Sequence, residues 1–265
     1  MANMPDAINA GGPGAIGRAA LVARRTLAEA LRLQLTVLLA LLGAGLVGVA
    51  LWLRDFNFGA AELKFIADLG LGAGSLAGAL LAALGMAHLY FRDLEGGLAA
   101  CVLTRRVRRG EYLAGKLAGV AALLALFTAG MGGMLGAVLQ ARSSQLGLGL
   151  VSVPVLFQAS ALVWLKISLV AAMTLLVCSY ARSALFASCA GLMLAVVAHL
   201  RPFTAAEGWL AWLRFWPNLG LFDPEPVLMG TALAPMRLIG LVGYWAVFMI
   251  LFGGLASYVF SRREI

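Results

Sequence analysis

Long apolar stretches constrain the fold of this chain more than any other feature of its sequence. They lie at about 35–53, 66–90, 117–139, 157–181, 184–200 and 238–260. A helix needs about 20 apolar residues to cross the hydrocarbon core of a bilayer, which is about 30 Å thick. Because lipid offers the backbone no hydrogen-bond partners, a spanning segment must be a helix or part of a closed barrel. The sequence lacks the apolar–polar alternation of a barrel, so it predicts an all-α integral membrane protein with six transmembrane helices.

The composition supports this class and excludes others. Of the 265 residues, 62% are hydrophobic and 12% are charged, against about 25% charged residues in a soluble domain. The net charge of +8 fits the excess of Lys and Arg on the cytoplasmic loops of membrane proteins. Since no aromatic-basic module or zinc pattern accompanies this charge, we expect no nucleic-acid partner. The spacing of Cys101, Cys178 and Cys189 matches neither a metal site nor a disulfide framework.

The basic residues indicate the orientation of the spans. With the N-terminus in the cytosol, most of them fall on the cytosolic side: Arg18, Arg24, Arg25, Arg32, Arg92, Arg105, Arg106, Arg108, Arg109, Lys116, Arg182, Arg262 and Arg263. Fewer fall on the other side: Arg54, Lys64, Arg142, Arg201, Arg214 and Arg237. This asymmetry predicts six spans with both termini in the cytosol, and a multi-pass location in a bacterial inner membrane. A single transmembrane domain then covers 17–265.

The N-terminal region divides into two parts. Residues 1–16 are rich in Gly, Ala and Pro, and we expect them to be disordered. Residues 17–34 read as an amphipathic elbow helix, with Leu27, Leu31 and Leu35 on one side and charged residues on the other. Such a helix lies in the membrane interface with its apolar side toward the lipid.

Two segments outside the spans are long enough to carry structure of their own. The first, 91–116, is highly charged and is placed in the cytosol. The second, 201–237, lies on the outer side and contains a capping box from Thr204 to Glu207. Four aromatic residues follow this box, namely Trp209, Trp212, Phe215 and Trp216. We expect re-entrant helices here, at the outer face between the fifth and sixth spans; the alternative is an aromatic belt that only anchors the protein.

Charged residues inside the spans are rare, and each is a candidate for function. An unpaired charge in the middle of a membrane costs about 2.5–3.5 kcal/mol. Lys166 lies about a third of the way into the fourth span from the outside, and Asp68 lies near the outer end of the second. Lys166 either reaches outward to the interface or lines an outward cavity, paired with Asp68, where it attracts an anionic group. We therefore treat Lys166 and Asp68 as candidate pathway charges.

No pattern typical of an enzyme is present in the sequence. The run from Gly110 to Lys116 has the first seven positions of a phosphate-binding P-loop, but Leu117 replaces the hydroxyl residue that binds magnesium. Metalloprotease and serine-hydrolase signatures are missing. The two histidines, His88 and His199, are predicted near opposite membrane faces and so cannot share a metal. We expect no catalytic residue, cofactor site or metal site in this chain.

The charged cytosolic segment carries a family resemblance. It reads Phe91-Arg-Asp-Leu-Glu95-Gly-Gly and then Leu103-Thr-Arg-Arg-Val107-Arg-Arg109-Gly-Glu111-Tyr-Leu-Ala-Gly115-Lys116. It resembles the loop between spans 2 and 3 of ABC type-2 transporter permeases, with Arg106 in place of the usual Pro and Arg108 in place of a small polar residue. The order of features over 17–265 is also similar, and within the family it looks most like permeases of multi-copper-enzyme and nitrous-oxide-reductase maturation.

This resemblance implies a permease subunit whose loop forms a coupling helix on a separate ATPase subunit. The residues implied in coupling are Phe91, Glu95, Leu103, Arg105, Arg106, Val107, Arg109, Glu111, Tyr112 and Lys116. It also implies an outer gate made of Trp209, Trp212, Phe215 and Trp216. The implied partners are two copies of the ABC ATPase, which bind ATP and magnesium, a second permease copy or paralogue, membrane lipid, and a periplasmic or membrane accessory protein.

Other interpretations stay open at this stage. The charged segment could be a solvated basic loop that only enforces topology. The chain could also be a non-transporting membrane scaffold of an assembly complex, or a secondary transporter. The near absence of acidic residues from the spans argues against the last of these.

Overall fold

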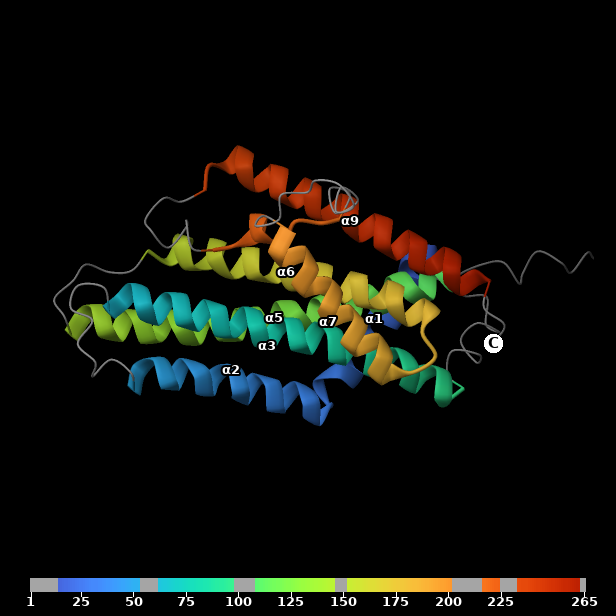
Figure 1. Ribbon diagram of the computed structural model, residues 1–265, viewed down its shortest axis with the longest axis horizontal. Coiled ribbons are helices and arrows are strands. Elements are labelled where there is room, and N and C mark those ends of the chain that lie inside the picture. Colours follow the sequence, from blue (N-terminus) through green and yellow to red (C-terminus); the bar gives the residue numbers. More distant parts are fainter. Residues whose placement is uncertain are drawn as a thin grey trace, which may run out of the picture.

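Each apolar stretch contains one helix in the computed structural model, which describes residues 14–52, 62–97, 108–145, 152–201, 216–224 and 233–262. The elements in Figure 1 are α1 (Ala15–Leu31), α2 (Gln34–Trp52), α3 (Glu62–Glu95), α5 (Arg109–Gln145), α6 (Val153–Tyr180), α7 (Ala184–Leu200), the short 3-10 helix η5 (Leu219–Phe222) and α9 (Pro235–Ser261). No strand occurs within these described residues. The predicted all-α fold is therefore confirmed for them.

The helices support the predicted number of membrane spans only in part. Four helices, α3, α5, α6 and α9, are long and apolar enough to cross a membrane. The bent pair of α1 and α2 can supply a fifth span. Helix α7 has 17 residues, which corresponds to about 25 Å and is short of a full crossing. The described chain is thus an all-α membrane protein with four or five candidate spans.

The N-terminal helix starts earlier than predicted and ends in a sharp bend. Helix α1 begins at Ala15, and the rest of the segment expected to be disordered, 1–13, lies outside the described residues. The axes of α1 and α2 differ by 64°. At the bend the hydroxyl of Thr36 donates to the backbone oxygen of Ala30 at 2.7 Å. The same carbonyl accepts from the backbone nitrogen of Leu33 at 3.2 Å, so two donors serve it where α1 ends.

The long helices pack side by side around a centre formed by α3 and α6 (Figure 1). Helix α2 covers α3, α5 lies against both α3 and α6, and α7 crosses α3 and α6. Glycines let α3 approach its neighbours closely. A Cβ at Gly70 would lie 2.6 Å from Leu135 of α5, and one at Gly78 would lie 2.8 Å from Ile167 of α6. Close packing through small residues is expected in membranes, where lipid removes the hydrophobic drive for helices to associate.

Helix α9 is the most peripheral of the long helices and is attached by aromatic side chains. The indole nitrogen of Trp245 donates to the hydroxyl of Ser168 on α6 at 2.7 Å. The Trp245 ring also lies 5.5 Å from the ring of Trp164, centroid to centroid. Trp164 in turn donates to the backbone oxygen of Ala121 on α5 at 2.9 Å. These contacts give every buried indole nitrogen in the cluster a partner.

Helix α1 crosses the first turns of α5 at a pair of glycines. A Cβ at Gly115 would lie 2.5 Å from the backbone oxygen of Ala19, and one at Gly119 would lie 2.6 Å from that of Ala23. Both glycines belong to the G-x-x-x-G spacing that allows helix backbones to touch. Only part of the α1 surface can therefore face lipid as predicted, because the side with its small residues packs on α5.

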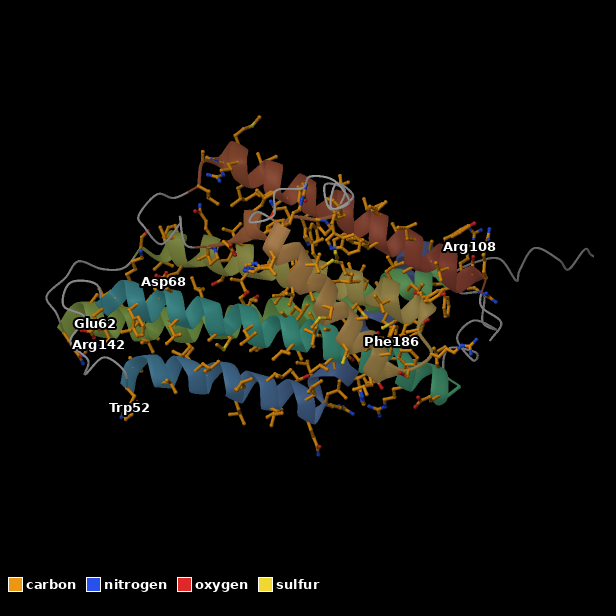
Figure 2. All side chains as sticks on the ribbon, viewed as in Figure 1. Trp52, Glu62, Asp68, Arg108, Arg142 and Phe186 are labelled. Atoms are coloured by element: carbon orange, nitrogen blue, oxygen red, sulfur yellow. The ribbon has the colours of Figure 1, made fainter. Side chains whose placement is uncertain are left out.

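The two ends of the bundle are distinct. We call the end at which α5 begins the proximal end and the end at which α5 finishes the distal end. Figure 2 shows Arg108 at the proximal end, and Trp52, Glu62 and Arg142 at the distal end. Arg142 of α5 pairs there with Glu62 of α3, with its Nε 3.0 Å from Oε1. This ion pair thus links the first turn of α3 to the last turn of α5 at the distal end.

We expect the α1–α5 crossing to be sensitive to a single methyl group. Gly119→Ala should lower the melting temperature, because overpacking costs about 1–3 kcal/mol and outweighs the gain of about 0.5–1 kcal/mol from replacing a helical glycine. Gly130→Ala is the matched control on the same helix, where a Cβ would meet nothing within 4 Å. Thermal unfolding in detergent, followed by tryptophan fluorescence, compares the two. Equal or greater stability of Gly119→Ala would contradict the close crossing.

Candidate functional site

The N-terminal turns of α5 are the meeting point of four helices at the proximal end. They contact α1, α3 and α9, as well as carrying part of the charged segment singled out in the sequence. The helix begins at Arg109, so the first seven positions of the P-loop-like run, Gly110 to Lys116, are helical rather than a loop. The contacts of these turns are formed by charged side chains, which we describe in turn.

A buried ion pair joins α5 to α3. The Lys116 side chain is 1% exposed, and its ammonium group donates to the carboxylate of Asp93. It also donates to the backbone oxygen of Leu89 at 2.7 Å and lies 3.2 Å from the hydroxyl of Tyr112. Tyr112 donates to the same Asp93 oxygen at 2.7 Å. Three partners thus surround the ammonium group, which offsets the cost of removing its charge from water.

A second charged contact joins α5 to α1. The guanidinium of Arg18 binds Glu111 through two hydrogen bonds, from Nε at 2.9 Å and from Nη2 at 2.8 Å. The Glu111 carboxylate also accepts from the backbone nitrogen of Arg108 at 3.2 Å, which caps the start of α5. Two hydrogen bonds between one guanidinium and one carboxylate fix the relative orientation of the two groups as well as their distance. Helix α1 is therefore oriented on α5 by charge and by the glycine crossing together.

Two further contacts extend the junction to α3 and α9. Arg92 of α3 lies 3.4 Å from Glu29 of α1, so Glu29 pairs across helices. Arg109 donates to the backbone oxygen of Ser261 at 2.6 Å and to that of Phe260 at 3.2 Å. Its positive charge lies at the C-terminus of α9, where the helix dipole and the unpaired carbonyls favour a cation. We call the set of contacts made by Arg18, Glu29, Arg92, Asp93, Arg109, Glu111, Tyr112 and Lys116 the proximal junction.

The ten residues predicted for ATPase coupling fall into four groups. Phe91, Tyr112 and Lys116 are 5%, 3% and 1% exposed, so their side chains serve the interior and are not available at the surface. Arg109 and Glu111 bind other helices of the same chain. Glu95 is exposed at the end of α3. The others, Leu103, Arg105, Arg106 and Val107, lie outside the described residues.

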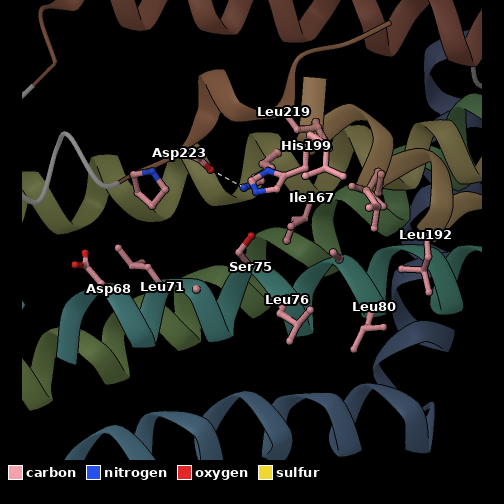
Figure 3. Close-up of a pocket in the computed structure, with 18 residues that line it drawn as sticks. Asp68, Leu71, Ser75, Leu76, Leu80, Ile167, Leu192, His199, Leu219 and Asp223 are labelled. Atoms are coloured by element: carbon pink, nitrogen blue, oxygen red, sulfur yellow. Dashed lines mark hydrogen bonds and ion pairs between the residues drawn. The ribbon is translucent and has the colours of Figure 1, made fainter. Parts of the chain in front are cut away.

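A cavity of about 650 Å³ lies in the distal half, between α3, α6, α7 and η5 (Figure 3). Lys166, near the middle of α6, donates to Asp223 at 2.6 Å, just after η5. This corrects the expected pairing of Lys166 with Asp68, because Asp223 arrives from the outer segment between α7 and α9. Asp68 lines the same cavity from α3. Of the two alternatives for Lys166, the structure has its side chain lining a cavity.

Of the four predicted gate aromatics, only Trp216 lies within the described residues; Trp209, Trp212 and Phe215 do not. The Trp216 ring packs 5.7 Å from that of Phe252 on α9. Its backbone oxygen accepts a hydrogen bond from Arg201, at the end of α7, at 2.6 Å. Asn218 next to it donates from its backbone nitrogen to Tyr244 of α9 at 2.8 Å. This part of the outer segment therefore bridges α7 and α9.

Metal and cofactor sites find no support in the described residues. Within them, no three His, Cys, Asp or Glu side chains gather closely enough to bind a metal ion. Cys178 is buried and Cys189 is exposed, and both are free thiols.

The comparisons with known proteins give no relative from which to transfer a function. No protein-family model matches the chain, and no curated protein sequence matches it.

Sequence reasoning missed three residues that complete these sites. Asp93 has a signal in the sequence, since it follows a span closely and faces the pair Tyr112 and Lys116, whose spacing of four places them on one helix face. Arg18 was placed on the polar side of an interfacial helix, without a partner. Asp223 carries no local signal, because only the return of the outer segment brings it to Lys166.

We expect the buried pair to behave as a unit in a double-mutant cycle. Lys116→Met leaves the Asp93 carboxylate buried without its cation, which should cost about 3–5 kcal/mol of unfolding free energy. Adding Asp93→Asn should recover much of this loss, because the second charge is removed as well. Denaturant unfolding in detergent measures both. Arg24→Met, on the exposed side of α1, is the control and should change stability by no more than about 0.5 kcal/mol.

If the losses of unfolding free energy caused by Lys116→Met and by Asp93→Asn simply add in the double variant, a direct interaction between the two groups is contradicted.

Proposed function

We propose that this chain is the membrane-spanning permease subunit of an ABC transporter, driven by a separate ATPase subunit that docks on the 91–116 segment. The observation that carries this proposal is the proximal junction. Both ends of that segment enter helices that are tied by ion pairs to the rest of the bundle. A partner that pushes or pulls the segment would act on α1, α3, α5 and α9 at once.

The junction favours coupling over a loop that serves only topology. Charges that enforce topology need only to remain in the cytosol, and they are satisfied by water. Here Lys116 is fully buried and depends on Asp93 and Tyr112, at a cost in desolvation that a solvated loop would avoid. Rigid charged links between helices are what transmission of a movement requires, because a packed interface shifts between discrete arrangements rather than deforming.

In this proposal the proximal end is cytosolic, both termini lie there, and the membrane is a bacterial inner membrane. Helix α2 and the short α7 count as spans, which gives six. The chain pairs with a second copy or a paralogue, ATP and magnesium bind in two ATPase subunits, and an accessory protein completes the complex. The outer segment that includes Trp216 serves as a gate, supported by its bridge from α7 to α9. Glu95, exposed beside the junction, is the described residue best placed for docking.

A secondary transporter is the second candidate, and one observation favours it. The sequence argument against it was the scarcity of acidic residues in the spans, yet Asp223 returns to pair with Lys166 inside the bundle. An ion pair within a transport path is a common feature of ion-coupled carriers. Transport by the purified chain in vesicles with an ion gradient and no ATP would establish this candidate.

We expect the chain, isolated in mild detergent from cells that express it with its neighbouring genes, to bring an ATPase subunit with it. Glu95→Lys should reduce the recovered ATPase more than tenfold without changing the melting temperature, because Glu95 takes no part in the ion pairs that join the described helices. Mass spectrometry of the isolated complex measures the ratio. Arg182→Glu is the matched control, since it reverses an exposed charge in the turn between α6 and α7.

Variants of the junction itself are unsuited to this test. Arg109→Glu would remove the contacts with α9 and change stability as well as docking. Recovery of the chain without an ATPase in every detergent tested would contradict the permease proposal and leave the scaffold or the secondary transporter.

A further inference from the structure

The distal cavity combines charged groups with apolar walls. Its volume of about 650 Å³ falls within the range of about 300–1,000 Å³ that is common for small-molecule sites. The polar and charged residues that line it are Asp68, Ser75, Lys166, His199 and Asp223. Figure 3 shows Ser75 of α3 and His199 of α7 pointing into the space beside the ion pair. A site of this composition suits a ligand with one polar end and a long apolar part.

The two members of the ion pair are held very differently. The Lys166 side chain is 12% exposed and projects from the middle of a long helix, about 20 Å from either end of α6. The Asp223 side chain is 42% exposed and lies in the short stretch after η5. Lys166 is therefore the more enclosed member of the pair and is anchored in a regular helix, whereas Asp223 is the more accessible member. This difference makes Asp223 the member that a ligand can replace.

One polar atom that lines the cavity has no hydrogen bond within the described residues. The Nδ1 of His199 is buried and makes none with them. An imidazole nitrogen in that state can donate to or accept from a ligand. Together with the Lys166 ammonium and the Ser75 hydroxyl, it gives the cavity three groups able to donate to an oxyanion.

Several aliphatic side chains of α3 and α7 that line the cavity also reach the surface. Leu76 of α3 is 57% exposed, and Val196 and Leu200 of α7 are also exposed, so the rim on this side is apolar. The floor is formed by Ile167 and Val170 of α6. Exposed aliphatic side chains of this kind are suited to contact with the apolar part of a membrane. A molecule dissolved in the membrane can enter there without crossing a polar barrier.

We propose that this cavity binds an amphiphile with a single anionic group, a carboxylate or a phosphate, which replaces Asp223 at Lys166. The acyl chain lies along the apolar walls of α3 and α7. A cationic ligand would have to take Asp223 from Lys166, and the ammonium of Lys166 would then lack its partner in a medium of low dielectric constant. A neutral amphiphile would contact the apolar walls but would leave the Lys166–Asp223 pair in place.

This inference does not depend on an ATPase partner, so it stands or falls separately from the proposed function. It predicts opposite effects on anion binding for substitutions of the two members of one ion pair. Removing the fixed cation must weaken binding of the anion, whereas removing the competing carboxylate must strengthen it. A pair that only stabilises the fold would not separate the two substitutions in this way.

The test is native mass spectrometry of the purified full chain in a neutral detergent, titrated with oleate, oleoyl lysophosphatidic acid and the uncharged monooleoylglycerol. We expect wild type to bind at least one anion about tenfold more tightly than monooleoylglycerol. Asp223→Asn should tighten that anion about tenfold, Lys166→Gln should weaken it at least tenfold, and Lys166→Arg should retain it. The carboxylate and phosphate arms identify the headgroup, and inorganic phosphate alone tests for a free anion without a chain.

Three results would overturn the proposal. Equal affinity of wild type for the anions and for monooleoylglycerol would show that charge is not recognised, and this needs no variant to fold. Weaker binding in Asp223→Asn would show that the carboxylate assists the ligand rather than competing with it. Tight binding of inorganic phosphate with no further gain from a chain would make the site a free-anion site instead.

Discussion

The ammonium group of Lys116 is the interaction on which the proximal half of the structure depends. It lies in the interior with Asp93, Tyr112 and the backbone of Leu89 as its partners. A buried cation tolerates little displacement, because moving any partner exposes an uncompensated charge in a medium of low dielectric constant. The relative position of α3 and α5 is thereby fixed. Arg18 and Arg109 then fix α1 and α9 on the same turns of α5.

The two ends of the bundle use charge in contrasting ways. At the proximal end each named charged group of α5 is bound to a neighbouring helix, and the glycine crossing brings α1 into backbone contact. In the distal half, the pair of Lys166 and Asp223 borders a cavity and one member is half exposed. Charged groups are thus enclosed between helices at the proximal end, whereas in the distal half they remain partly accessible from a cavity.

Residues that looked like a docking motif prove to have a structural role. Tyr112, Gly115 and Lys116 carried much of the family resemblance, yet Tyr112 and Lys116 are buried and Gly115 allows α1 to touch α5. A motif at a helix start can be specific because it organises a junction, and contact with a partner can then fall to exposed neighbours such as Glu95. The pairing of Lys166 with Asp68 was wrong for a related reason. Spacing along one helix identifies which groups share a face, but it says nothing about a segment that returns from elsewhere.

The sequence by itself determined that the chain is helical, where each long helix lies, and which residues are too polar for lipid. These properties follow from local composition and period, since a stretch of about 20 apolar residues has few alternatives to a helix. Only the tertiary structure decided the bend of 64° after α1, the partners of Lys116 and Lys166, and the cavity beside α7. Those features join residues far apart in the chain, such as Arg18 with Glu111 and Lys166 with Asp223. Their energies depend on distance and burial in three dimensions, which no local pattern encodes.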